Sequence, residues 1–346
     1  MPTAVDIFCG SGGVTAGLRM ARWRVLAACD NDPAVANTYR ANHPKTKFVS
    51  GDISDDATID DLAMKVGGEH VDLMIICAPC QPFSSQNRVR AEDRRKQLIV
   101  RALAAVERLE PTAIFFENVP GLASAAYRSI LDAVKARLSQ LGYALSEPMV
   151  RDAADYGVPQ RRRRCIMFAA KSQAAVNAFV SRDVRVPPRT VKHAIGNLPP
   201  LLSGEADACD ILHRARVHQP IAIERLMNIP CDGGSRSSLP LRLELKCHVG
   251  RKSSFSDVYG RMAWSGPAPT LTTGCTDITR GRFAHPTQHR AITLREAARL
   301  QSFPDKYIFT GNVSEIATQI GNAVPPEMVR AFSPAFRAAL KAAASA

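Results

Sequence analysis

The sequence predicts an α/β fold, in which a parallel sheet carries helices on both faces, together with a smaller, loop-rich part. The first 170 residues alternate short apolar runs with helical patterns, as strand–helix units do. From about Ser181 to about His289 the chain is instead rich in Pro, Gly, Ser, Arg and His and has no strong periodicity. This segment is a second domain or a large insertion, and a loop-rich segment of this length is usually functional.

The strands and helices of the first part follow one another as strand–helix units require. Apolar runs predict strands at Ala4–Phe8, Arg24–Cys29, Lys47–Ser50, Val71–Cys77, Thr112–Phe116 and Cys165–Ala169. The stretches between them predict helices at Val14–Arg22, Pro33–Asn42, Gln97–Glu110 and Ala123–Leu141. The helical pattern returns from Thr293 in LREAARLQ, and QIGNAVPP (Gln319–Pro326) opens a last helix towards Ala346.

The composition is ordinary for a soluble globular protein except for its net charge of +13. An excess of Lys and Arg favours a polyanionic partner, because these residues release counterions when they neutralise phosphates. Charge alone fits a merely basic soluble protein equally well. No stretch approaches the ~18 apolar residues of a membrane helix, and the N-terminus lacks a signal-peptide pattern. The nine scattered cysteines fit reduced thiols of a cytoplasm better than a disulfide framework.

A glycine-rich turn, DIFCGSGG (Asp6–Gly13), joins the first strand to the first helix. Glycines there allow a tight turn and let a ligand approach the helix N-terminus. Asp30 ends the next strand, twenty residues after Gly10, the spacing at which an acidic side chain meets a nucleotide ribose. A nucleotide-like cofactor and a plain strand–helix turn both remain open. Asp52, after the third strand, could lie near the base of such a cofactor or could cap a helix.

Cys80 follows the apolar run VDLMIICAP and therefore lies just beyond the C-terminal end of a strand. Open α/β sheets bind their ligands at these ends. Most cysteines are small buried hydrophobes, so a structural role is the plain alternative. An ordinary thiol has a pKa of ~8.5, and positive charge nearby increases the reactive thiolate fraction. Arg88 and four further basic residues up to Lys96 supply such charge.

Glu117 directly follows the next predicted strand, Thr112–Phe116, in the run TAIFFENV. A carboxylate at this place is suited to hold or donate a proton, although a structural salt bridge is the alternative. The run Gln160–Arg164, QRRRR, enters a strand in which alternate residues share a face. Arg162 and Arg164 would then point to one side, with Arg161 and Arg163 on the other, and one pair would face the cleft.

Two other readings of the cysteines are weaker. Cys77 and Cys80 form the C-x-x-C of a thiol–disulfide exchanger, but redox exchange explains neither the glycine turn nor Glu117. The later cysteines, Cys209 to Cys275, have no paired spacing typical of zinc ligands, so no metal is expected.

In this order, the motifs resemble those of the DNA cytosine-5 methyltransferase family, of the bacterial restriction–modification type. The resemblance covers nearly the whole chain, and Tyr259–Thr276 also resembles the later part of the family's target-recognition region. It rests on DIFCGSGG, Asp30, GDI (Gly51–Ile53), PCQPFS (Pro79–Ser84), ENV (Glu117–Val119), QRRRR, REAARLQSFPD (Arg295–Asp305) and QIGNAVPP.

The resemblance implies a mechanism for methylating carbon 5 of a cytosine that is flipped out of double-stranded DNA. The Cys80 thiolate would add to carbon 6 of the base, while Glu117 supplies a proton to ring nitrogen 3. Carbon 5 would then accept a methyl group from S-adenosyl-L-methionine, and loss of the carbon-5 proton would expel the thiolate. Arg162 and Arg164 resemble the arginines that hold the flipped base and the nearby backbone.

The resemblance also implies which residues contact the cofactor and the DNA. The cofactor would lie along the glycine turn, with its ribose on the acid at Asp30 and its adenine near Asp52 and Ile53. Asn322 would close its methionine end, so that the C-terminal segment returns to the first domain. The expected cofactor contacts are Phe8, Gly10, Gly12, Asp30, Asn31, Asp52, Ile53, Leu98 and Asn322. The expected DNA contacts are Ser84, Gln86, Arg88, Thr270 and Leu271.

We therefore expect a discontinuous, S-adenosylmethionine-binding catalytic domain at residues 1–181 and 290–346, built on a Rossmann-like methyltransferase sheet with helices on both faces. A smaller, loop-rich target-recognition domain is expected at residues 182–289. The expected partner is double-stranded DNA, with a cognate restriction endonuclease that acts separately, no membrane, and a monomeric enzyme in the bacterial cytoplasm. A tRNA cytosine-5 methyltransferase and a non-catalytic S-adenosylmethionine-binding DNA protein are the alternatives. The tRNA enzymes carry a Cys-Phe-Thr motif that has no counterpart in this sequence. A non-catalytic binding protein would lack the thiol or the glutamate, and both are present here. DNA amino-methyltransferases carry an Asp/Asn-Pro-Pro-aromatic motif instead.

Overall fold

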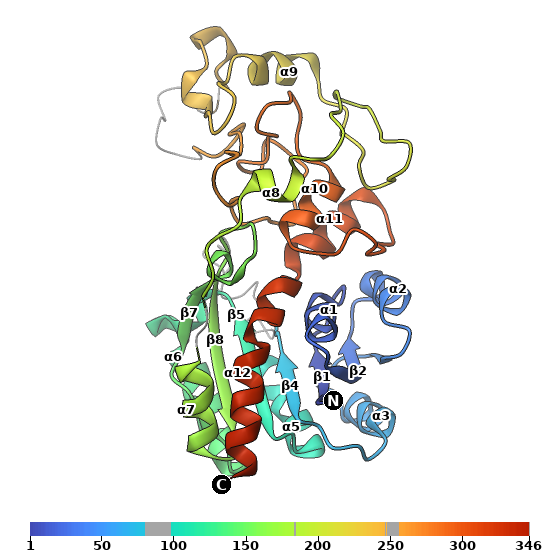
Figure 1. Ribbon diagram of the computed structural model, residues 1–346, viewed down its shortest axis with the longest axis vertical. Coiled ribbons are helices and arrows are strands. Elements are labelled where there is room, and N and C mark those ends of the chain that lie inside the picture. The colour runs from blue at the N-terminus through green and yellow to red at the C-terminus, as the bar shows by residue number, and fades with distance from the viewer. Residues whose placement is uncertain (80–97, 183–184, 246, 248–255, 346) are drawn as a thin grey trace. The chain divides into compact units, whose positions relative to one another are not determined.

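The structure is a computed structural model that describes residues 1–79, 98–182, 185–245, 247 and 256–345 (Figure 1). It divides into two compact units. Unit 1 comprises residues 1–156, 163–186 and 324–346, and unit 2 comprises residues 157–162 and 187–323. The C-terminal residues therefore belong to the same unit as the N-terminus. Residues 290–323, which we expected in the catalytic domain, lie in unit 2. Whether function divides at the expected bounds stays a prediction.

Unit 1 is built on one sheet with the strand order β3-β2-β1-β4-β5-β8-β6, and β7 also pairs with β8. The six predicted strands are all present, at bounds close to those expected. The strands are β1 (Thr3–Ile7), β2 (Arg24–Asp30), β3 (Lys47–Ser50), β4 (Leu73–Ile76), β5 (Ala113–Asn118), β6 (Ala144–Leu145), β7 (Met149–Asp152) and β8 (Arg163–Ala170).

The sheet is mixed: the parallel pairing predicted from the strand–helix units is present over most of it, and one edge is antiparallel. Strands β3, β2, β1, β4 and β5 pair in parallel, whereas β8 runs antiparallel to β5, β6 and β7. The connection between β7 and β8 is short and contains no long helix, so the two strands can pair only by reversing direction. The parallel part reverses its order between β1 and β4, and ligands bind outside the carboxyl ends of strands at such a point.

Helices cover both faces of this sheet, as predicted (Figure 1). Helix α2 coincides with the predicted Pro33–Asn42, whereas the predicted helix at 97–110 is divided at Ala102 into α4 and α5. The helices of unit 1 are α1 (Gly13–Met20), α2 (Pro33–Asn42), α3 (Asp56–Val66), α4 (Leu98–Arg101), α5 (Leu103–Leu109), α6 (Arg128–Gln140), α7 (Gln173–Ser181) and α12 (Pro326–Ala344).

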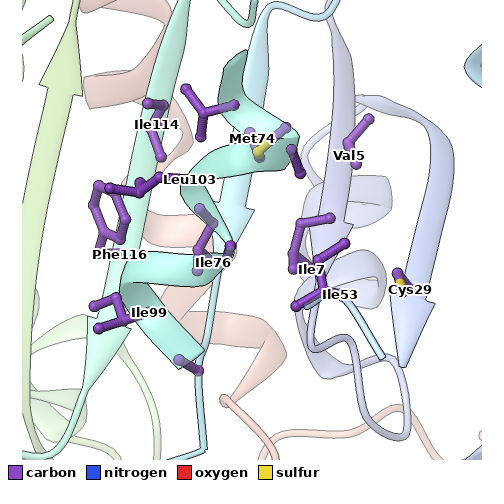
Figure 2. Packing of buried hydrophobic residues seen from close by; sticks show 14 of the residues in the cluster. Val5, Ile7, Cys29, Ile53, Met74, Ile76, Ile99, Leu103, Ile114 and Phe116 are labelled. Atoms are coloured by element: carbon purple, nitrogen blue, oxygen red, sulfur yellow. The ribbon is translucent and has the colours of Figure 1, made fainter. Parts of the chain in front are cut away.

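Two apolar layers hold these helices to the sheet. On one face, Phe168 of β8 stacks on Phe179 of α7 at a centroid distance of 4.1 Å, and Phe115 of β5 meets Phe336 of α12 at 5.1 Å. On the other face, side chains of β1, β4 and β5 pack against α4 and α5, and Ile76 and its neighbours are fully buried (Figure 2). Burial of this apolar area is the main source of stability in such a fold.

The C-terminal helix α12 packs closely against α1, with the backbones of the two helices nearly in contact. A Cβ atom added at Gly17 of α1 would lie 2.3 Å from the carbonyl oxygen of Pro326, so only glycine fits there. Trp23 also donates a hydrogen bond from Nε1 to Oγ of Ser333, at 2.8 Å. These contacts hold the first half of α12 beside α1 and the residues that follow it.

Unit 2 has little regular structure, which confirms the loop-rich texture predicted for most of it. Its helices are α8 (Val191–Ile195), α9 (Pro220–Met227), α10 (Leu294–Leu300) and α11 (Val313–Asn322). Buried polar side chains help to hold its loops together. The fully buried Arg261 donates to the carbonyl oxygens of Leu226, Ile229, His285 and Gln288, and Arg290 forms a buried ion pair with Glu296 at 2.8 Å.

Within the described ranges, no helix combines the length and the apolar composition needed to cross a membrane. Within the same ranges, no three His, Cys, Asp or Glu side chains come together as a metal site would require. The eight cysteines in the described part of the chain are all free thiols.

Candidate active site

The turn between β1 and α1 has an unusual backbone. Phe8, Gly10 and Gly12 all have positive φ angles, of 59°, 51° and 89°. Glycine adopts this region readily, but for phenylalanine it is strained, and such residues cluster at functional sites. A Cβ atom added at Gly10 would meet no heavy atom within 4 Å, so the turn leaves open space on that side.

Asp30, the last residue of β2, holds this turn with its carboxylate. Its Oδ2 accepts a hydrogen bond from the backbone N–H of Gly10 at 2.8 Å, and its Oδ1 accepts one from Asp32 at 2.9 Å. Burial raises the pKa of the Asp30 carboxyl above its ordinary value. Each carboxylate oxygen has two lone pairs, so capacity remains for the hydroxyl groups of a ligand.

The other cofactor contacts expected in unit 1 lie at three places, after β2, after β3 and at the start of α4. Asn31 follows Asp30 and is exposed, while Asp52 follows β3 and accepts a hydrogen bond from the N–H of Ser54 at 2.8 Å. The N-cap of α3 is Asp55, so the helix-capping alternative for Asp52 is wrong. Ile53 is buried in the apolar layer that Phe8 also contacts. Leu98 is half-buried at the start of α4.

His43 supports the glycine turn, and no sequence pattern indicates this role. Its Nε2 lies 3.2 Å from the carbonyl oxygen of Gly12, and its Nδ1 lies 3.2 Å from a guanidinium nitrogen of Arg19. Burial lowers the pKa of His43 to about 4, so the ring is neutral at pH 7. A neutral ring beside an arginine accepts at Nδ1 and therefore donates from Nε2 to Gly12. This histidine is far from Gly12 in sequence, and only the fold brings it there.

Asp6, in the middle of the sheet beneath the turn, is fully buried. Its Oδ2 accepts a hydrogen bond from Oγ1 of Thr15 at 2.7 Å, while its Oδ1 has no hydrogen-bond partner among the described residues. Burial raises the pKa of Asp6 to about 7, and the charge of Asp30 adds to the effect. The carboxyl group is therefore close to half-protonated at neutral pH.

Replacing Asp6 with asparagine is expected to flatten the pH dependence of stability. The folded wild type keeps a proton that the unfolded chain loses, so its stability falls as pH rises from about 4 to about 7. At pH 8, Asp6→Asn should be more stable by about 1–3 kcal/mol, because it removes a buried charge but leaves an amide poorly paired. Urea denaturation at pH 5 and pH 8 measures this. If the free energy of unfolding of Asp6→Asn changed between pH 5 and pH 8 as much as that of the wild type, the raised pKa of Asp6 would be contradicted.

Glu117 and Arg164 form a nearly buried ion pair on neighbouring strands β5 and β8. Arg164 Nε lies 2.7 Å from Glu117 Oε1, and the two side chains are only 10% and 9% exposed. Arg162 and Arg164 are both buried while Arg161 and Arg163 are exposed, which confirms the predicted alternation. The charged pair at the carboxyl end of β5 is where a ligand of this sheet would bind.

Asn118, the neighbour of Glu117, holds the segment that leads to Cys80. Its Nδ2 donates to the carbonyl oxygen of Ala78 at 3.1 Å, and its Oδ1 accepts from the N–H of Val119 at 2.9 Å. Sequence reasoning missed this contact, although ENV was one of its motifs. Cys80 itself, and the expected DNA contacts Ser84, Gln86 and Arg88, lie outside the described residues.

A separate group of site residues meets in unit 2. Arg162 donates to the carbonyl oxygens of Leu271 at 3.1 Å and Gly321 at 2.8 Å. Thr270 is exposed and donates from Oγ1 to the carbonyl oxygen of Arg161 at 2.7 Å, whereas Leu271 is buried. Asn322 ends α11 with its side chain exposed. The roles expected for these residues stay predictions.

Comparison with known proteins gives a family match along most of the chain. The family model described as C-5 cytosine-specific DNA methylase matches residues 3–335. The Type II methylase M.HgiDII of Herpetosiphon aurantiacus is 36% identical over 332 residues, which cover 94% of this chain and 92% of that protein. The Type II methyltransferase M.XorII of Xanthomonas oryzae pv. oryzae is 33% identical over 357 residues, covering 95% of this chain and 83% of that protein.

Solved structures share the fold. A prophage-encoded protein of E. coli described as a DNA modification methyltransferase superposes with a TM-score of 0.69 at 26% identity, covering 99% of this chain and 100% of that one. The S. pombe Dnmt2 methyltransferase superposes with a TM-score of 0.61 at 19% identity, covering 96% of each chain. At this identity the second likeness concerns the fold alone.

Proposed function

The chain belongs to the C-5 cytosine-specific DNA methylase family, and we propose that Cys80 and Glu117 carry its reaction on a cytosine flipped out of the duplex. The observation that supports this most directly is the Glu117–Arg164 pair at the carboxyl end of β5. The adjacent Asn118 fixes Ala78, two residues before Cys80 in the sequence. A thiol and a carboxylate would thus be supplied from neighbouring strand ends.

Carbon 5 of cytosine is a poor nucleophile, and the proposed residues overcome this in two linked steps. The Cys80 thiolate forms a bond to carbon 6, and Glu117 delivers a proton to ring nitrogen 3, which receives the displaced electron density. Carbon 5 becomes enamine-like and can accept the methyl group that S-adenosyl-L-methionine supplies when bound. Loss of the carbon-5 proton to a base then restores the ring double bond, the thiolate leaves, and nitrogen 3 returns its proton.

Arg164 would hold Glu117 in place for this chemistry. The two side chains are nearly buried, so their mutual attraction is screened less than at a surface. Arg164 also donates to the carbonyl oxygen of Arg163 at 2.8 Å, which fixes the orientation of its guanidinium group. The remaining donors of such a group suit the carbonyl oxygen of a base or a phosphate.

S-Adenosyl-L-methionine is the cofactor that the family implies, and the first turn fits it. The open space at Gly10 and the spare acceptor capacity of Asp30 suit a ribose. We propose that Phe8, Gly12, Asn31, Asp52, Ile53, Leu98 and Asn322 complete the site.

Replacing Asp30 with alanine is expected to weaken cofactor binding about 10- to 100-fold, because hydrogen bonds to a charged group are lost. Titration calorimetry with S-adenosylhomocysteine measures the dissociation constant. Asp60→Ala removes the same charge from an exposed position on α3 and should leave that constant unchanged. Equal affinity of Asp30→Ala and wild type would exclude the ribose role.

DNA is the substrate that follows from the family, and the finer contacts are proposals. Residues 182–289 would read the sequence in the major groove, with Thr270 and Leu271 near the target base. Ser84, Gln86 and Arg88 would contact the DNA next to the flipped nucleotide. Arg162, which donates to the carbonyl oxygen of Leu271, would help to hold the flipped base and the nearby backbone. The net charge of +13 would draw the protein to the phosphate backbone.

The central experiment is methyl transfer from labelled S-adenosylmethionine to DNA or to tRNA. Transfer to double-stranded DNA and not to tRNA is the expected result, and transfer to tRNA alone would replace the proposal by the tRNA alternative. Bisulfite sequencing of DNA from cells that express the protein then identifies the methylated sequence. No 5-methylcytosine in either substrate would refute the function.

The biological setting follows from the relatives by analogy. Both are named as Type II enzymes, so we propose that the methylation protects host DNA within a restriction–modification system. A cognate endonuclease would act separately, and the methyltransferase would work as a monomer. Because its substrate is DNA, it would work in the bacterial cytoplasm.

A further inference from the structure

We propose that two buried amides, Gln160 and Gln301, couple DNA binding to cofactor binding. They join the Thr270–Leu271 segment to the backbone beside Asn322. The inference rests on the proposed function, in which Thr270 and Leu271 contact DNA and Asn322 contacts the cofactor. It assigns to Gln160 and Gln301 the role of positioning residues, since neither would touch a ligand.

Three hydrogen bonds of the two amides form a chain with a single direction, and Gln160 Nε2 also donates, at the longer distance of 3.4 Å, to the carbonyl oxygen of Leu300 outside this chain. Leu271 N–H donates to Gln160 Oε1 at 3.0 Å, Gln160 Nε2 donates to Gln301 Oε1, and Gln301 Nε2 donates to the carbonyl oxygen of Ala323 at 2.6 Å. A backbone N–H can only donate and a carbonyl can only accept, so the two ends fix the orientation of both amides. Both side chains have no exposed surface.

Arg162 makes a second tie between the same two segments. Its guanidinium group donates to Leu271 on one side and to Gly321 on the other. The segments also touch directly, because a Cβ atom added at Gly321 would lie 2.5 Å from the carbonyl group of Thr272. The backbone on both sides of Asn322, at Gly321 and Ala323, is therefore tied to residues 271–272.

The arrangement places the two exposed side chains, Thr270 and Asn322, at the ends of a rigid buried connection. Buried amides that lose a partner are left unsatisfied, so a shift at one end of the chain must be followed at the other. A ligand that fixes Thr270 would then favour one position of Asn322, and the reverse. Coupling between two sites is reciprocal and typically changes affinity 5- to 150-fold.

The test measures how much DNA tightens the binding of S-adenosylhomocysteine, which lacks the transferable methyl group. The probe DNA is a duplex that carries the sequence found by bisulfite sequencing. In the wild type we expect the dissociation constant to fall about 5- to 150-fold when DNA is bound. In Gln301→Met, which keeps the side-chain length but cannot continue the chain, the change should shrink to less than about twofold. Affinity for S-adenosylhomocysteine alone should change little.

Gln319→Met is the matched control. Gln319 is buried in α11 close to Asn322, and its Nε2 donates to the carbonyl oxygen of Thr310 at 2.8 Å, outside the chain of amides. This variant should keep the coupling of the wild type. Because the two amides act in series, Gln160→Met/Gln301→Met should lose no more coupling than either single variant. If the double variant lost the sum of the coupling lost by the two single variants, the proposal would be contradicted. Full coupling in a folded Gln301→Met would contradict it as well.

Gln160→Glu tests the same chain within one folded protein. A protonated carboxyl at this position can accept from Leu271 N–H and donate to Gln301 Oε1, whereas an ionised one can only accept. Coupling should therefore be present at pH 5.5 and lost reversibly at pH 8. Equal coupling at both pH values would overturn the inference. If the wild type methylates no DNA, the proposed function fails; if it does and Gln301→Met stays coupled, only this inference fails.

Discussion

Replacing Cys80 with alanine is expected to abolish methyl transfer to DNA, with a loss on the order of 10⁴-fold or more, as for other enzymes that lose their nucleophile. Without the thiolate, carbon 5 cannot become enamine-like, and no other described thiol can substitute. Cys77, the nearest cysteine in sequence, has a pKa raised well above its ordinary value by burial and by the charge of Glu117. The measurement is the rate of label transfer from S-adenosylmethionine under single-turnover conditions.

DNA that carries 5-fluorocytosine tests the same bond directly. Fluorine cannot leave carbon 5 as a proton does, so the covalent adduct should survive denaturation. The wild type and Cys77→Ala should both form it, and Cys80→Ala should not. Because thiol–disulfide exchange needs both Cys77 and Cys80, an adduct that forms in Cys77→Ala and not in Cys80→Ala would argue against that chemistry. An adduct in Cys80→Ala, or its loss in Cys77→Ala alone, would place the nucleophile elsewhere.

Replacing Glu117 with glutamine should lower kcat about 10²- to 10⁴-fold, because the proton for ring nitrogen 3 is lost. The same change should lower the free energy of unfolding by about 3–5 kcal/mol, since Arg164 is left as an unpaired charge at a nearly buried site. Single-turnover kinetics and urea denaturation measure the two effects separately.

A double variant separates catalysis from stability. In Glu117→Gln/Arg164→Met the buried charge is removed together with its partner, so most of the lost stability should return. Activity should stay as low as in Glu117→Gln, because the carboxyl group is still absent. If activity returned together with stability, Glu117 would be a structural ion-pair partner and not the proton source.

Much of the candidate site could be predicted from the sequence because its parts lie at strand ends. The carboxyl ends of parallel strands meet at one edge of a sheet, so short apolar runs already placed Asp30 and Glu117 at the same edge. Alternation along a strand also predicted which arginines of QRRRR share a face, since successive side chains point to opposite faces, and the structure shows that Arg162 and Arg164 are the buried pair. The open space at Gly10 agrees with the glycines of the first motif.

Other features could not be predicted, because they depend on contacts between distant segments. The pairing of β8 with β5 is antiparallel, and it is this register that brings Arg164 to Glu117. No local pattern marks His43 as the residue that supports Gly12. Gln160 and Gln301 are 141 residues apart, and no sequence pattern around either residue indicates that their side chains meet.

The family, the strand–helix alternation and the kinds of chemical group available could all be inferred from the amino-acid sequence, because they depend on residue type and on short-range backbone preferences. The environment of each group and its partners emerge only when the chain folds: a buried carboxyl at Asp6, an ion pair across two strands, and a chain of amides through unit 2. Sheet order and packing bring together residues that the chain separates, and burial then sets the strength of their charges and hydrogen bonds.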